Sequence, residues 1–249
     1  MKPLGKETFI CLDCETTGLE VSTDRVIEIA AIKFTFEKEL DRFETLIDPE
    51  CAIPAISQSI HNISSEMLQN KPKIKEVLGS FLKFLGRHTI VGHSIKFDLD
   101  ILQKEAQRAQ IPCSLETLSY IDTLRLARLY GESPANSLQT LREHFNIEPE
   151  GAHRAMSDVT VNIEVFKHLT TKFKNLKELT ERLKKPILMK MMPLGKHKGR
   201  KFSEIPADYL HWASKKDFDM VLLYSIRTEL KKRGIGKNFG QASNPFADL

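Results

Sequence analysis

The apolar positions in the first half of the chain fall into short runs that predict strands. Residues 8–15 form an apolar run ending in acids, residues 25–36 are β-branched and apolar, and residues 43–47 repeat this pattern. Because the intervening turns are short, these three runs predict an antiparallel meander. Two shorter runs, residues 89–92 and 119–122, predict two further strands.

From about residue 64 the apolar residues recur at spacings of three and four, which is typical of amphipathic helices. This spacing predicts helices over residues 74–85 and 97–107, a helix capped by Ser137 and a longer helix capped by Ser157. Strands that come first and then alternate with helices indicate an α/β domain with a mixed sheet. We therefore predict an α/β fold in which helices flank a five-stranded mixed sheet.

The pattern divides the chain into four segments. The main α/β domain is expected over residues 6–174, and a polar, Lys-rich helical linker is expected over residues 175–185. Residues 186–235 predict a compact basic accessory module with two helices. Residues 236–249 are polar and predict a flexible tail.

Charge is distributed unevenly along the chain, although the net charge is only +4. Residues 1–166 hold 18 Lys and Arg against 25 Asp and Glu, whereas residues 167–237 hold 19 against 7. A basic back third behind an acidic front indicates contact with a polyanion. Solvated, Lys-rich helix faces are the alternative interpretation.

Membrane and disulfide classes are disfavoured by composition. The chain has no run of eighteen apolar residues and no apolar signal-peptide core at its start, so we expect a cytoplasmic protein without membrane contact. Cys11 and Cys14 form a C-x-x-C, which could indicate zinc or redox chemistry. On a strand, however, residues three apart point to opposite faces, which favours buried, reduced thiols.

The strongest chemical signal is Asp-Cys-Glu-Thr-Thr-Gly at residues 13–18. Asp13 and Glu15 are two apart at a strand end, so both carboxylates project from one face. Neighbouring carboxylates repel unless a cation lies between them, and hard oxygen ligands favour Mg²⁺ or Mn²⁺. A lone D-x-E is weak evidence, since any polar strand end could contain it.

Two further stretches strengthen the metal interpretation. Asp98 stands at a helix start directly after a short strand, and His153 precedes Asp158 by five residues at another helix start. Two-metal phosphodiester hydrolysis needs carboxylates for ions about 4 Å apart and a base for the attacking water. Histidine is the side chain best suited to that base near neutral pH.

These motifs resemble those of the DEDD exonuclease superfamily, in the histidine-containing branch that includes the bacterial DNA polymerase III epsilon proofreading subunit. The motifs are Asp13-x-Glu15-Thr16-Thr17-Gly18, His93-x-x-x-Phe97-Asp98 and His153-x-x-x-x-Asp158. The segment around His61 also resembles the segment that links the first two motifs in that family. The resemblance covers roughly residues 8–170 and implies a ribonuclease H-like exonuclease fold.

The resemblance also implies a role for each acidic residue. Asp13, Glu15 and Asp158 would hold the ion that activates water, with Asp13 bridging to a second ion that Asp98 supports. The cofactors implied are two Mg²⁺ or Mn²⁺ ions. His153 would accept the proton of the attacking water, and the products would be 5′-mononucleotides.

Substrate contacts follow from the same resemblance. The backbone around Thr16, Thr17 and Gly18 would lie near the terminal nucleotide, and His61 and Phe97 are further candidates for substrate binding.

The sequence departs from the family pattern at two positions. Ser94 stands where the family usually has Asn, and Asn62 stands where it usually has Gly. Neither change removes a carboxylate, so both affect how the substrate fits and not the metal ligands.

The sequence offers three other candidate residues. We interpret His93 as a core histidine and Asp122 as a helix cap. Lys96 could equally contact phosphate or be an ordinary surface lysine.

The module at residues 186–235 resembles a small uncharacterised bacterial module with an M-P-x-G-K-x-K-G pattern. Its Gly-Lys-His-Lys-Gly turn would let lysines and backbone amides approach phosphate. Tyr209 and Trp212 lie three apart on a predicted helix, and core packing is favoured over base stacking. Residues 241–246 faintly resemble a sliding-clamp-binding peptide, but a structureless tail is the favoured interpretation.

Together these features predict a 3′-to-5′ exonuclease that acts on single-stranded or frayed 3′ ends of nucleic acid, in DNA proofreading or repair. RNA 3′-end trimming or degradation of short oligoribonucleotides is the alternative within the same chemistry. No residue of the motifs is specific for a 2′-hydroxyl, so the motifs do not distinguish DNA from RNA. An inactive nucleic-acid-binding scaffold is the alternative from another class. A polymerase or a sliding clamp is a candidate partner.

Overall fold

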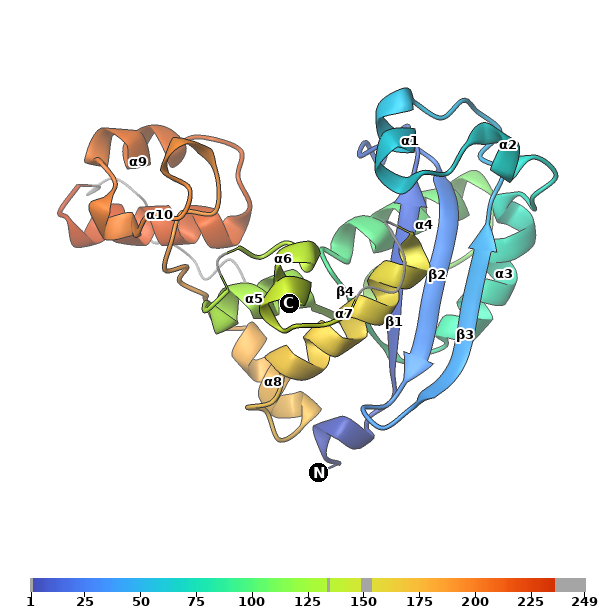
Figure 1. Cartoon of the computed structure of the whole chain (residues 1–249), viewed down its shortest axis with the longest axis horizontal. Helices are drawn as coiled ribbons and strands as arrows, with labels where there is room; N and C mark the ends of the chain where they lie inside the picture. The colour runs from blue at the N-terminus through green and yellow to red at the C-terminus, as the bar shows by residue number, and fades with distance from the viewer. Residues whose placement is uncertain (1, 134, 149–153, 236–249) are drawn as a thin grey trace.

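The computed structural model describes residues 2–133, 135–148 and 154–235. Its centre is a five-stranded sheet in the order β3-β2-β1-β4-β5 (Figure 1). The strands are β1 (Phe9–Thr16), β2 (Val26–Phe34), β3 (Glu39–Leu46), β4 (Thr89–Gly92) and β5 (Tyr120–Asp122). The first three strands form the antiparallel meander, and β4 and β5 run parallel to β1, which confirms the predicted mixed sheet.

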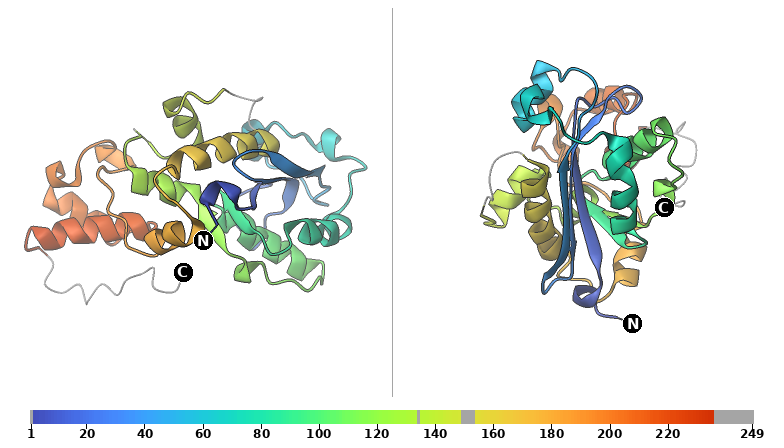
Figure 2. Two further views of the ribbon diagram at one scale, coloured as in Figure 1. Left: turned by 90° about the horizontal axis from the view of Figure 1, so that it is seen from below. Right: turned by 90° about the vertical axis from the view of Figure 1, so that its right-hand side faces the viewer.

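Helices cover both faces of this sheet. The helices of the main domain are α1 (Ala55–His61), α2 (Ser65–Leu68), α3 (Ile74–Leu85), α4 (Lys96–Arg108), α5 (Thr123–Tyr130), α6 (Leu138–His144), α7 (Ala155–Leu169) and α8 (Leu176–Leu183). Figure 2 shows the sheet edge-on, with α3 and α4 on one side and α6 and α7 on the other. Short 3₁₀ turns lie at Leu4–Lys6, Leu115–Thr117, Gly195–His197 and Phe202–Glu204.

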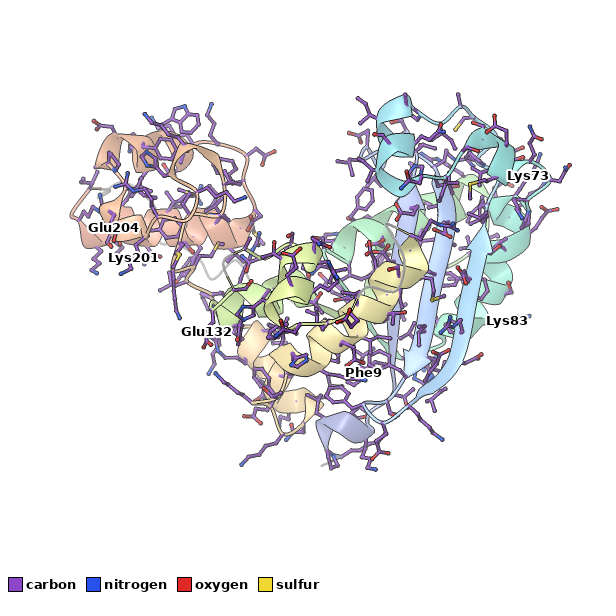
Figure 3. All side chains as sticks on the ribbon, in the orientation of Figure 1. Phe9, Lys73, Lys83, Glu132, Lys201 and Glu204 are labelled. Atoms are coloured by element: carbon purple, nitrogen blue, oxygen red, sulfur yellow. The ribbon has the colours of Figure 1, made fainter. Side chains whose placement is uncertain are left out.

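Each face of the sheet has its own hydrophobic core. On the α7 side, Phe9, which Figure 3 labels, packs edge-on against Phe166, and their ring centroids are 5.2 Å apart. On the other side, Phe81 of α3 is fully buried against the sheet. Cys11 belongs to the first core and Cys14 to the second, so the two thiols lie on opposite faces as predicted.

Two predicted boundaries are wrong, each for a physical reason. Strand β3 begins at Glu39 rather than at residue 43, because it is an edge strand whose exposed polar residues hide the strand pattern. Helix α7 begins at Ala155, so Ser157 is not its cap. The carboxylate of Glu28 on β2 instead accepts the Ala155 N–H at 3.2 Å, which supplies the cap from another element.

Residues 175–185 hold α8, which packs on the main domain. Leu179 is fully buried in the α7-side core, and Asn175 caps the helix by accepting the Glu178 N–H at 3.0 Å. Leu183 contacts both this core and the core of the following segment. The linker segment is thus helical and anchored by apolar contacts.

The C-terminal module, residues 186–235, has a core of its own and contains α9 (Ala207–Ala213) and α10 (Met220–Lys232). Tyr209 packs against this core, but Trp212 is 49% exposed, so the expected packing is wrong for the tryptophan. Arg128 of α5 forms two hydrogen bonds with Asp219, of 2.8 and 3.0 Å.

No helix in the described part of the chain is long and apolar enough to span a bilayer.

The two departures from the family pattern both occupy left-handed backbone. Asn62, at the C-cap of α1, has φ 57°, and Ser94, in the turn between β4 and α4, has φ 62°. Asparagine adopts this conformation at lower cost than most residues, so it replaces glycine readily at position 62. Serine is less suited to it than asparagine, which makes Ser94 a strained position.

We therefore expect Ser94→Asn to stabilise the fold by about 0.5 kcal/mol, because asparagine relieves left-handed strain. The measurement is the shift in thermal midpoint relative to the wild type. Ser114→Asn is the matched control, since Ser114 has φ −138° and offers no strain to relieve. Equal shifts in both variants would contradict this explanation.

Candidate active site

Carboxylates from separate elements converge at the carboxyl-end edge of the sheet. Asp13 and Glu15 lie at the end of β1, and Asp158 lies in the first turn of α7. One oxygen from each of the three lies within 4.8 Å of the others, and all three residues are half-buried. Hard oxygen donors at this separation are a donor set suited to a divalent cation.

Asp98 lies beside this trio, in the first turn of α4. Its side chain is 5% exposed and accepts the Cys14 N–H at 2.9 Å. This bond ties the start of α4 to β1, between the positions of Asp13 and Glu15. The structure therefore brings all four predicted carboxylates to one place.

Burial raises the pKa values of carboxylates in this cluster. Burial raises the pKa of Glu15 to about 8, and the charges of Asp158 and Glu28 add to this shift. Burial also raises the pKa of Asp98 to about 7, and the pKa of Asp13 is raised by burial and then by the charge of Asp98. Each shift means that a further negative charge is costly here, so a bound cation would be strongly favoured.

Glu28 and Arg154 are residues of this site that the sequence reasoning missed. Glu28 is fully buried and faces Glu15 across the β1–β2 pair. Its carboxylate accepts hydrogen bonds from the Arg154 guanidinium and from the Ala155 N–H. The pair fixes the start of α7, and so the position of Asp158. His153, the predicted base, lies outside the described residues and directly precedes Arg154.

The threonines of the first motif are held within their own loop. Thr16 donates its hydroxyl to the Gly18 carbonyl at 2.7 Å, and Thr17 donates to Asp24 at 2.9 Å. A Cβ at Gly18 would lie 2.5 Å from the Asp24 carboxylate, so any other residue there would have to displace the group that accepts the Thr17 hydrogen bond. The loop is therefore rigid, and Ser57 of α1 donates to the Thr17 carbonyl at 2.6 Å.

The other predicted substrate residues are placed differently. His61 is buried at the end of α1, where its Nδ1 accepts the Ile63 N–H at 3.0 Å. Its Nε2 has no hydrogen-bond partner among the described residues. Phe97 is half-buried and packs against the second core, one residue before Asp98.

The remaining candidates have structural partners. Asp122 caps α5 by accepting the Leu124 N–H at 2.8 Å, which confirms the predicted cap. His93 is half-buried, with its Nδ1 3.0 Å from the Thr123 hydroxyl. Lys96 pairs on the surface with Asp100 at 2.8 Å.

Residues 10–166 match a protein-family model described as Exonuclease. This match spans more than half of the chain and includes every carboxylate of the cluster. The chain belongs to the exonuclease family. Residues 180–226 match a second family, described as a candidate quorum-sensing-regulated virulence factor, which overlaps the C-terminal module.

Similar proteins are named as bacterial DNA polymerase III enzymes or subunits. A PolC-type DNA polymerase III of Thermotoga maritima is 39% identical over 163 residues, which are 65% of this chain and 12% of that protein. A DNA polymerase III subunit epsilon of Treponema pallidum is 35% identical over 64% of this chain and 74% of its own length. This exonuclease thus spans only a small part of the PolC-type relatives.

Solved structures share the fold. E. coli Exonuclease I, in complex with a dA16 oligonucleotide, superimposes with a TM-score of 0.61 at 22% identity. The superposition covers 72% of this chain and 42% of the other. This likeness confirms the ribonuclease H-like exonuclease fold with its flanking helices.

The raised pKa values predict how a divalent ion affects stability at different pH values. Because the folded pKa values of Glu15 and Asp98 lie above their ordinary values, the metal-free fold binds more protons than the unfolded chain. Its stability should therefore fall as pH rises from about 4 to 8. Mg²⁺ at a hundredfold excess over its Kd should raise the free energy of unfolding by about 2.7 kcal/mol.

Thermal melting with Mg²⁺ and with EDTA checks this at pH 6 and pH 8.5. We expect the larger Mg²⁺-dependent gain at pH 8.5, where the carboxylates are ionised. Asp13→Asn should raise the melting temperature in EDTA, because it removes one of the repelling charges. Equal gains at both pH values would contradict the electrostatic explanation.

Arg154→Met should destabilise the fold by about 3 kcal/mol, because it leaves the buried Glu28 carboxylate without its cationic partner. Arg42→Met is the matched control, since the exposed Arg42–Glu39 pair is worth less than about 1 kcal/mol. The measurement is urea unfolding of the two variants. A loss at Arg154 no larger than the loss at Arg42 would show that Glu28 does not depend on this partner.

Proposed function

We propose that the chain is a metal-dependent 3′-to-5′ exonuclease that releases 5′-mononucleotides from nucleic acid. The observation that carries this proposal is the convergence of Asp13, Glu15 and Asp158 within 4.8 Å of one another, with Asp98 beside them. Membership of the exonuclease family supports it.

The four carboxylates would hold the divalent ions, two Mg²⁺ or Mn²⁺ in this proposal. Asp13, Glu15 and Asp158 form the half-buried donor set, and Asp98 faces the same space from α4. Such ions, when bound, lower the pKa of a coordinated water and neutralise charge on the phosphate. The protein contributes a rigid frame, since β1, α4 and α7 each supply a ligand from regular structure.

His153 is proposed as the base that takes the proton from the attacking water. Its neighbour Arg154 is held by Glu28, so the backbone next to the histidine is anchored to β2. The anchor fixes Arg154 and the first turn of α7, which carries Asp158. Proton transfer needs such positioning within hydrogen-bond reach.

The terminal nucleotide is proposed to lie against the Thr16–Gly18 loop and helix α1. Three large apolar side chains are exposed beside this loop, namely Leu19 at 86%, Ile56 at 78% and Ile60 at 61%. The hydrogen bond from Ser57 to the Thr17 carbonyl joins α1 to the loop. Exposed apolar side chains next to a rigid polar loop are suited to contact a base while the loop contacts the sugar.

DNA is the proposed substrate, and proofreading or repair the proposed setting. Similar proteins are named DNA polymerase III PolC-type and DNA polymerase III subunit epsilon, and E. coli Exonuclease I was solved with a DNA oligonucleotide. RNA trimming is the outcome to distinguish by experiment, and a polymerase or sliding clamp is the proposed type of partner.

The test uses 5′-labelled single-stranded DNA and RNA of one sequence, with Mg²⁺, with Mn²⁺ and with EDTA. A metal-dependent ladder that shortens from the 3′ end is expected, faster on DNA. A faster ladder on RNA would favour trimming. No ladder on either strand, from protein verified as folded, would leave the nucleic-acid-binding scaffold as the better account.

Asp13→Ala and Asp158→Ala should each lower turnover by more than about a thousandfold, because each removes a ligand from a set that acts as a unit. Asp100→Ala is the matched control, since Asp100 is an exposed acid on α4 that pairs with Lys96. The measurement is kcat on the labelled strand, and near-normal turnover in either ligand variant would rule out the metal assignment.

A further inference from the structure

A cavity of about 510 Å³ lies between the exonuclease domain and the C-terminal module. Its walls are the turn that follows β4, helix α5 with the segment after it, and residues 189–193 of the module. Lys198 of the module completes it. This volume lies in the range of pockets that bind a small molecule or a single nucleotide.

The cavity adjoins the carboxylate site through the turn between β4 and α4. His93 and Ser94 line the cavity, and four residues after Ser94 the same chain carries Asp98. Asp122 accepts the Ser94 N–H at 3.0 Å, and its charge also acts on Asp98. One turn of backbone therefore separates the cavity from the carboxylate site.

The charge of the cavity is opposite to that of the carboxylate site. None of the described residues that line the cavity is acidic, whereas Lys190 and Lys198 both line it. Neither lysine forms an ion pair with any residue in the described ranges, and both are exposed. Two cations without a bound partner, next to a cluster that would hold cations, favour a phosphate backbone that passes from one to the other.

The remaining surface of the cavity suits a nucleobase. Met191 is 44% exposed at its wall, and Leu138 also lines it. The Asn136 side chain adds a polar group that can meet a base edge. A flexible, polarisable methionine accepts flat rings of different shape, which is what a sequence-tolerant site requires.

The two sides of the cavity are fixed to each other. Arg128 forms its two contacts with Asp219 across the boundary, so its own charge is already paired. The stem of Lys190 passes over Gly131, where a Cβ would lie 3.6 Å from its Cε. The cavity is thus formed before any ligand binds, which lowers the entropic cost of binding.

We propose that this cavity binds an unpaired nucleotide of the substrate strand, upstream of the 3′ end, with its phosphates on Lys190 and Lys198. The inference rests on the proposed exonuclease function and deepens it. In this proposal the base lies against Met191 and Leu138 and not against a complementary base, so the substrate class is a strand whose 3′ end is single-stranded over several nucleotides. The C-terminal module then acts as a strand-holding element.

The test is binding of a 5′-fluorescent twelve-nucleotide single strand, in Ca²⁺ in place of Mg²⁺, with the strand checked to be intact. Lys190→Ala combined with Lys198→Ala should weaken Kd roughly 10- to 25-fold at 0.1 M salt. The slope of log affinity against log salt should fall by about 1.4, because each phosphate contact on a single strand contributes about 0.7.

The control is Lys201→Ala combined with Lys215→Ala, which removes the same charge from the same module. Both control lysines are exposed and neither lines the cavity, and Figure 3 shows Lys201 on the side of the module away from the exonuclease domain. A clearly smaller effect of the control pair is expected. Equal effects of the two pairs, or none at Lys190 and Lys198, would overturn the proposal.

A second readout separates this proposal from the proposed function. The ratio of kcat/KM for the twelve-nucleotide strand to that for a dinucleotide should fall at least about tenfold in the cavity variant, because a dinucleotide has no upstream nucleotide to hold. An unchanged ratio would overturn the cavity assignment. Absence of hydrolysis by the wild type would count against the exonuclease function alone, since the binding test does not depend on turnover.

Discussion

The lost hydration and the mutual repulsion of four clustered carboxylates are the constraint on which the rest of this structure depends. Asp13, Glu15, Asp98 and Asp158 reach one edge of the sheet from three separate elements, and burial raises the pKa of those for which a shift is resolved. A fold gains nothing in stability from such a cluster, because each charge opposes the next. A bound cation would offset this repulsion, and the oxygen donors are suited to hold one.

The surrounding elements hold the repelling groups in place. The Cys14 N–H fixes Asp98, while Glu28 joins the start of α7 to β2 through Arg154 and the Ala155 N–H. The surface charge is negative at the carboxylate cluster and positive at Lys190 and Lys198 of the C-terminal module. A polyanion whose end reaches the metal site and whose body lies on lysines would meet complementary charge along its length.

The sequence predicted what local spacing determines and missed what long-range contacts determine. Asp13 and Glu15 could be placed on one face because strand periodicity is local, and the Asp122 cap followed from its place before a helix. Glu28 could not be foreseen, because its partner Arg154 lies 126 residues away and the alternation of β2 reads as apolar on both faces. The same contact explains the misplaced start of α7, and the exposure of Trp212 depends on packing that no spacing shows.

Anomalous diffraction from crystals grown with Mn²⁺ tests the central claim most directly, because it places the ions without reference to activity. We predict Mn²⁺ at the cluster, bound by Asp13, Glu15 and Asp158, with a second ion between Asp13 and Asp98. A cluster without Mn²⁺, in crystals where the ion occupies other acidic groups, would contradict it.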